Sequence, residues 1–288
     1  MGAAFLITLR EGLEISIVLA VLIGYLVKTD RRGDLRAVWL GTGVATLACV
    51  VAGVAVHAVT KGLNGKAEPA VEGSLAVLAA IVLTFMILWM HKNAHTMGGH
   101  LRAKVDGATT LAGVAMVAFV GVAREGFETV LFLLGAESGN AKGADVVIGG
   151  VLGLALSAAV GIAMYLGSNK IDLRSFFRYT GIVLILFAAG LVGKAFHEFP
   201  ELLEFNNSWL MHSAWSITSG PFAKGTFYDF LNGLFGWANE PERIRVLAYG
   251  CYVVPVMWLF LRNPAPVTAT ADATVEPVPS LGSQTATL

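Results

Sequence analysis

Two short charged motifs interrupt otherwise apolar stretches of this 288-residue sequence. Each motif is an arginine followed by two glutamates in the pattern R-E-G-x-E. The charged residues are Arg10, Glu11 and Glu14 in the first motif and Arg124, Glu125 and Glu128 in the second. Residues three or four apart are neighbours on a helix, so the two glutamates of a motif share a face and the arginine reaches the second glutamate. The pattern predicts four carboxylates and two guanidinium groups on apolar helices.

This set of groups is typical of a cation site. The simpler interpretation is that Arg–Glu pairs lock two helices together. One such pair per motif would be enough for that purpose. The second glutamate leaves each motif with surplus negative charge, and ionisable groups inside a membrane by default mark an ion pathway. Oxygen ligands suit hard cations. The residue types do not choose among iron, manganese, magnesium and calcium.

The composition indicates that the helices carrying these motifs lie in a membrane. Hydrophobic residues make up 56% of the chain and charged residues 14%, where soluble domains carry about 25%, and the mean hydropathy is +0.69. This excludes a soluble enzyme or a nucleic-acid binder. A hydrocarbon core of about 30 Å needs about 20 helical residues. The sequence predicts an all-α, polytopic membrane protein with seven transmembrane helices, at about 2–27, 37–60, 70–91, 108–136, 145–167, 176–196 and 244–262.

The two motifs are expected at the same depth in the membrane. Only 13 uncharged residues follow Glu14 within the first span, about 20 Å of helix, and a run of the same length precedes Arg124. Spans 1 and 4 run in opposite directions, which predicts a 3+3 inverted repeat (about 2–91 and 108–196) plus one extra helix. Such repeats place a substrate site at their interface, and Gly12 and Gly126 would let a neighbouring helix approach.

The loop charges predict the orientation. The segments on the same side of the membrane as the 28–36 loop carry 11 basic residues, and those on the opposite side carry 7. By the positive-inside rule, the N-terminus is therefore expected outside and the C-terminus inside. The segment 197–243 is then an external loop. The membrane domain ends at about 262, and the Pro/Thr/Ala-rich segment 263–288 is expected to be a disordered cytoplasmic tail.

A second acidic cluster follows span 6 in the stretch KAFHEFPELLEF. Its members are His197, Glu198, Glu201 and Glu204. If this stretch is helical, the glutamates form a stripe at the outer mouth that could capture a cation. A solvated loop end is the alternative, because Pro200 breaks a helix outside its first turn. The methionines within the spans, including Met86 and Met90, are expected to be packing residues.

Paired R-E-G-x-E motifs in oppositely directed spans resemble the oxidase-dependent iron transporter family, which includes fungal high-affinity iron permeases and bacterial permeases of the EfeU type. The resemblance covers residues 1–262. It implies a non-enzymatic permease that carries ferrous or ferric iron across a cytoplasmic or plasma membrane, without a permanently bound cofactor. By match, the iron-handling residues are Glu11, Glu14, Glu125 and Glu128, with Arg10 and Arg124 beside them. His197, Glu198 and Glu201 are similar to the H-E-x-x-E stretch of the bacterial members.

The resemblance also implies a partner, a separate oxidase, peroxidase or periplasmic iron-binding protein that delivers the metal. Two alternatives remain open: a transporter of another divalent metal such as manganese, and a membrane di-metal carboxylate oxidase. Such oxidases use E-x-x-H repeats, and neither motif contains one.

Overall fold

The computed structural model describes residues 1–62, 67–93, 107, 110–138, 143–165, 173–202 and 208–262, and it is helical throughout most of them. The long helices are α1 (Gly2–Lys28), α2 (Leu35–Lys61), α3 (Ala67–Asn93), α5 (Leu111–Ser138), α6 (Gly143–Tyr165), α7 (Leu173–Leu202) and α10 (Arg243–Leu261). The short ones are η1 (Arg32–Asp34), α8 (Ser208–Met211) and α9 (Thr226–Phe235). Each long helix lies where an apolar stretch predicts it. The largest difference is at the end of α7, which continues past Pro200.

Five helices, α2, α3, α6, α7 and α10, are long and apolar enough to cross a membrane. The chain is therefore a multi-pass membrane protein. The helices that carry the charged motifs, α1 and α5, are not among the five. Large apolar side chains such as Leu47 on α2 and Val151 on α6 are exposed, as expected of surfaces that contact lipid.

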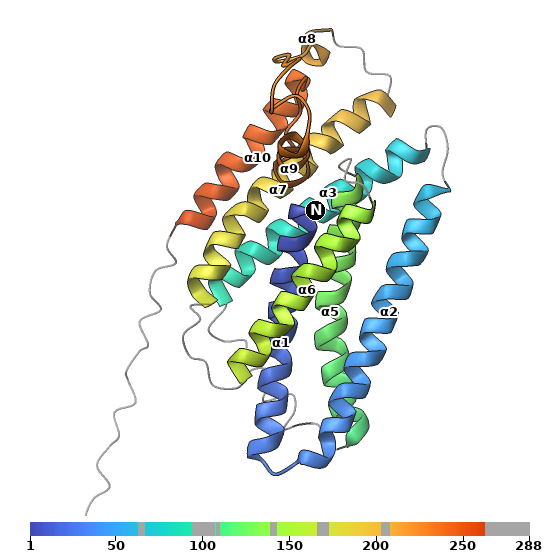
Figure 1. The fold of residues 1–288 in the computed structure, drawn as a ribbon, viewed down its shortest axis with the longest axis vertical. Helices are drawn as coiled ribbons and strands as arrows, with labels where there is room; N and C mark the ends of the chain where they lie inside the picture. The colour runs from blue at the N-terminus through green and yellow to red at the C-terminus, as the bar shows by residue number, and fades with distance from the viewer. Residues whose placement is uncertain are drawn as a thin grey trace, which may run out of the picture.

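The long helices form two groups, one of α1, α2, α5 and α6 and the other of α3, α7 and α10 (Figure 1). In the first group α1 packs mainly on α6, α5 packs mainly on α2, and α1 and α5 touch each other. In the second group α7 packs on α3 and α10. A shared apolar core includes Leu83 of α3, Leu184 of α7 and Phe260 of α10, and it reaches Phe132 of α5. The motif helices are thus enclosed by other helices.

Small residues permit the close packing within the first group. On α6 the stripe that faces α1 consists of Gly149, Gly153, Ser157 and Gly161, and on α2 the stripe that faces α5 consists of Gly41, Ala45, Cys49 and Gly53. A Cβ atom on Gly153 would collide with the carbonyl oxygen of Phe5, and one on Gly41 with the carbonyl oxygen of Ala115. Backbones in such contact exclude any larger residue.

The segment between α7 and α10, expected as a loop with little regular structure, contains a helix that packs into the bundle. The helix α9 contacts α7 and α1, and its Leu234 belongs to the buried core. Gly236 ends α9 in the left-handed conformation (φ 66°), where glycine is favoured, and its backbone lies directly against Gly190 of α7. The predicted tail 263–288 lies outside the described residues.

Candidate cation site

The two motifs meet where α1 and α5 pack together. Carboxylate oxygens of Glu11, Glu14 and Glu125 all lie within 4.8 Å of one another, and the three side chains are buried. Among the described residues, this is the group of acidic or sulfur- and nitrogen-bearing side chains close enough to hold one metal ion. Three of the four glutamates expected at the site are therefore brought together from two helices.

The fourth glutamate, Glu128, is held by its own arginine. Arg124 Nε donates to Glu128 Oε1 at 3.1 Å, and Arg10 NH2 lies 3.4 Å from Glu14 Oε1. Both pairs have the i,i+4 spacing, so both arginines reach the second glutamate of their motif. The pairs with the first glutamate are longer, at 3.6 Å for Arg10–Glu11 and 3.8 Å for Arg124–Glu125.

Several buried carboxylate oxygens accept no hydrogen bond within the described part of the chain. Those in the two motifs are both oxygens of Glu11 and one oxygen each of Glu14, Glu125 and Glu128; one oxygen of Glu242 lies outside the motifs. A buried polar group without a partner costs about 1–3 kcal/mol, and a charged one costs more. A cation that prefers oxygen ligands would satisfy these atoms. The arrangement is suited to binding a hard cation between α1 and α5.

The last turn of α3 contacts both arginines. Arg10 NH2 lies 3.1 Å from the sulfur of Met90, and the guanidinium of Arg124 lies over the ring of Trp89, 5.3 Å from its centroid. The two arginines differ in environment, because the side chain of Arg10 is 2% exposed and that of Arg124 is 45% exposed. Met90 is buried, as expected of a packing residue, and its sulfur also accepts from Arg10. A partner 80 residues away in sequence leaves no local signal.

The central glycine of each motif faces a second helix on the side away from the site. A Cβ atom on Gly126 would lie 2.6 Å from Cys49 Sγ of α2, and one on Gly12 would collide with Ser157 Oγ of α6. The glycines therefore allow α2 and α6 to support the motif helices directly, as their position in the motif predicts.

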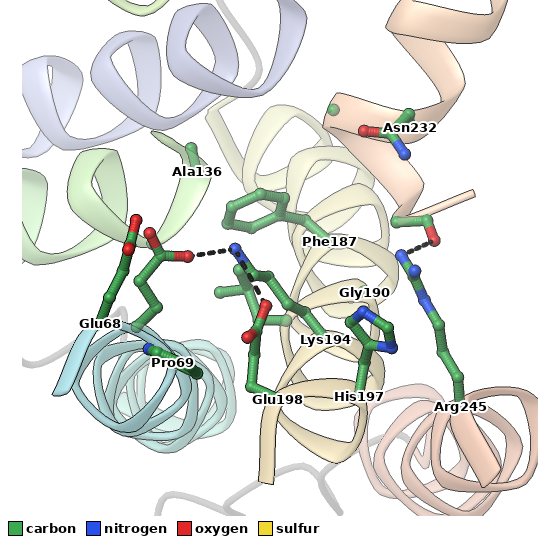
Figure 2. Close-up of a pocket in the computed structure, with 15 residues that line it drawn as sticks. Glu68, Pro69, Ala136, Phe187, Gly190, Lys194, His197, Glu198, Asn232 and Arg245 are labelled. Atoms are coloured by element: carbon green, nitrogen blue, oxygen red, sulfur yellow. Dashed lines mark hydrogen bonds and ion pairs between the residues drawn. The ribbon is translucent and has the colours of Figure 1, made fainter. Parts of the chain in front are cut away.

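A cavity of about 610 Å³ lies at the end of α7 beside the second acidic cluster. Lys194 reaches across it to Glu72 of α3 at 2.8 Å and lies 3.8 Å from Glu198 (Figure 2). Glu72 and Lys194 belong to no recognisable sequence motif, and their pairing across this cavity was not expected.

The two members of the second cluster whose side chains the structure describes, His197 and Glu198, turn to different partners. His197 Nδ1 pairs with Glu242 Oε1 at 3.2 Å, whereas Glu198 turns toward Lys194. The hydrogen bond with His197 lowers the pKa of the Glu242 carboxyl below its usual value. Glu201 lies in α7, but its side chain is outside the described residues, as is Glu204.

Long apolar helices packed around buried carboxylates define an integral membrane protein with an internal acidic cluster. Comparison with known sequences names the class: the chain belongs to the iron permease FTR1 family, whose model matches residues 1–262. The resemblance inferred from the two motifs is confirmed. Family membership makes the protein a membrane-embedded iron permease.

Curated relatives cover almost the whole chain. It is 34% identical over 278 residues to the ferrous iron permease EfeU of Yersinia pestis. The aligned residues make up 95% of this chain and 98% of the relative. It is 30% identical over 269 residues to the ferrous iron permease EfeU of Escherichia coli O6:H1, with 92% and 96% covered. The comparison with solved structures found no significant match.

Proposed function

We propose that the protein moves iron into the cytoplasm through the site between α1 and α5. Glu11, Glu14 and Glu125 bind the ion, and Arg10 and Arg124 balance the charge. During passage of the ion, Glu128 exchanges its hydrogen bond with Arg124 for a contact with the ion. The observation that carries the proposal is the convergence of buried carboxylate oxygens that lack hydrogen-bond donors within the described residues. Four glutamates and two arginines leave a formal charge of −2 when all are ionised, which a ferrous ion neutralises.

In this proposal α1 and α5 also cross the membrane, giving seven spans. Their lengths of 27 and 28 residues correspond to about 40 Å of helix, more than the hydrocarbon core requires. Enclosure by α2, α6 and the core with α3 and α7 buries Arg10, Glu11, Glu14 and Glu125, while Arg124 stays 45% exposed. The basic residues of the loops favour the N-terminus outside and the C-terminus inside the cytoplasmic membrane.

The helix contacts support an inverted repeat of α1–α3 and α5–α7. The α1–α6 and α2–α5 interfaces use matching residues, with an offset of 114 between α1 and α5 and of 108 between α2 and α6. Three contacts between α6 and α1 match three between α2 and α5. Gly149 with Phe5 matches Gly41 with Phe119, Ser157 with Gly12 matches Cys49 with Gly126, and Gly161 with Ser16 matches Gly53 with Val130. A repeat of this kind would place the site on its pseudo-symmetry axis, where transporters alternate between two openings.

Transport of iron is favoured over the two alternatives. The cluster that could hold a metal consists of carboxylates alone, whereas a di-metal carboxylate oxidase adds histidines from E-x-x-H repeats. Manganese has similar ligand preferences, and the names of the relatives favour iron. Delivery by a separate oxidase, peroxidase or periplasmic iron-binding protein, with capture at His197, Glu198, Glu201 and Glu204, completes the proposal.

Uptake into proteoliposomes tests the proposal. Purified protein is reconstituted and given radioactive ferrous iron under a reductant, with manganese and zinc as competitors. We expect saturable iron uptake that is lost in Glu11→Gln and only weakly inhibited by manganese. Preferred uptake of manganese would establish the other divalent-metal transporter, and oxygen consumption without uptake would establish the oxidase.

A further inference from the structure

Arg124 donates a hydrogen bond to Glu128, but neither motif arginine pairs at full strength with Glu11, Glu14 or Glu125. Charge-assisted hydrogen bonds between guanidinium and carboxylate are about 2.7–2.9 Å long. Arg10 approaches Glu11 and Glu14 only to 3.6 and 3.4 Å, and Arg124 approaches Glu125 only to 3.8 Å. A guanidinium that moved onto these oxygens bidentately would occupy the positions that an ion needs.

Two adjacent residues of α3 account for the separation. The sulfur of Met90 is the hydrogen-bond acceptor for Arg10 NH2 at 3.1 Å, and the ring of Trp89 lies against the guanidinium of Arg124 at 5.3 Å. A thioether is a weak acceptor, and an aromatic face attracts a cation without accepting a conventional hydrogen bond. Both contacts hold an arginine while leaving carboxylate oxygens without a hydrogen bond, as both oxygens of Glu11 are within the described chain.

We propose that Met90 and Trp89 are positioning residues of the cation site, which hold Arg10 and Arg124 back so that Glu11 and Glu125 remain available to the ion. This inference rests on the proposed function of the carboxylates. Since Met90 contacts Arg10 of α1 and Trp89 contacts Arg124 of α5, two adjacent residues of α3 set the position of the positive charges of both motifs. Removing either contact lets an arginine compete with iron, so the affinity for iron falls while the path remains open.

Transport kinetics in proteoliposomes test the inference with Met90→Leu and Trp89→Leu. Each variant is expected to raise the iron concentration at half-maximal uptake about 3- to 10-fold, the loss expected for one contact to a guanidinium, with the maximal rate within about twofold of the unmodified protein. Trp89→Phe keeps an aromatic face and is expected to restore most of the affinity. The controls are Met86→Leu, one turn earlier and buried in the core, and Phe85→Leu, whose side chain is exposed. Both controls should leave the half-maximal concentration unchanged.

The outcomes separate this inference from the proposed function. If Glu11→Gln transports normally, the carboxylate site itself is wrong. If Glu11→Gln is inactive while Met90→Leu and Trp89→Leu behave like Met86→Leu, only the positioning role is overturned. A loss of maximal rate without a change in half-maximal concentration would indicate ordinary packing and would also overturn it. If Met90→Leu does not reach the membrane, the comparison of Trp89→Leu with Trp89→Phe decides.

Discussion

Gly126 of α5 lies so close to Cys49 of α2 that a Cβ atom on the glycine would sit 2.6 Å from the sulfur. Real Cβ atoms do not approach another atom so closely, so a side chain here would push the two helices apart. The same relationship joins Gly12 to Ser157. The spacing of the helices behind the site therefore depends on these glycines.

We expect Gly126→Ala to reduce iron uptake strongly and to lower the stability of the protein by about 1–3 kcal/mol, the usual cost of overpacking. Uptake and thermal unfolding in detergent measure the two effects. Gly24→Ala on α1 is the matched control, because a Cβ at Gly24 meets nothing within 4 Å. Equal behaviour of the two variants would show that the helices can separate freely.

Replacing either arginine by lysine keeps the charge but removes the planar fork that contacts two carboxylates. We expect Arg10→Lys to reduce uptake at least tenfold, because Arg10 is buried and contacts Glu11, Glu14 and Met90. Arg124→Lys should be milder, since Arg124 is largely exposed. Uptake normalised to the amount of protein in the membrane makes the comparison. Normal transport by both variants would mean that the arginines supply only charge.

Single Glu→Gln changes at positions 11, 14 and 125 are each expected to reduce transport at least tenfold, because each removes a charged ligand from a buried site. Glu128→Gln should be milder, since Glu128 is hydrogen-bonded to Arg124. Residues that act as one unit are not additive, so Glu11→Gln combined with Glu125→Gln should be hardly worse than either alone. Additive losses would indicate two separate sites.

The pair of His197 and Glu242 predicts a pH dependence of stability. Because the hydrogen bond lowers the pKa of Glu242 in the folded protein, its stabilising effect is complete above the ordinary carboxyl pKa of about 4.3 and is lost as the pH falls through the lowered value. The difference in Tm between the unmodified protein and Glu242→Gln should therefore be present at pH 6 and shrink as the pH falls below about 4.3. A constant difference down to pH 3 would contradict the pairing.

Much of the fold could be predicted from the sequence because the apolar stretches are long and sharply bounded. The positions of the seven long helices follow from hydropathy, and the i,i+4 pairs of each motif follow from helix geometry. The contacts of Met90 with Arg10 and of Lys194 with Glu72 could not be predicted, because they join distant segments and have no sequence pattern. The helix α9 was missed because it is only ten residues long and the aromatic residues around it obscure the helical spacing of its apolar residues.

The backbone contact between Gly190 and Gly236 fixes one wall of the cavity beside α7. The segment that carries α9 is anchored to the middle of α7 by these two facing glycines and by Leu234 in the core. The opposite wall is the start of α3, which is held to α7 by the ion pair of Glu72 with Lys194 and by the apolar core that both helices share. A side chain at Gly190 or Gly236 would push α9 away from α7 and change the shape of the cavity, because Asn232 and Gly236 line it.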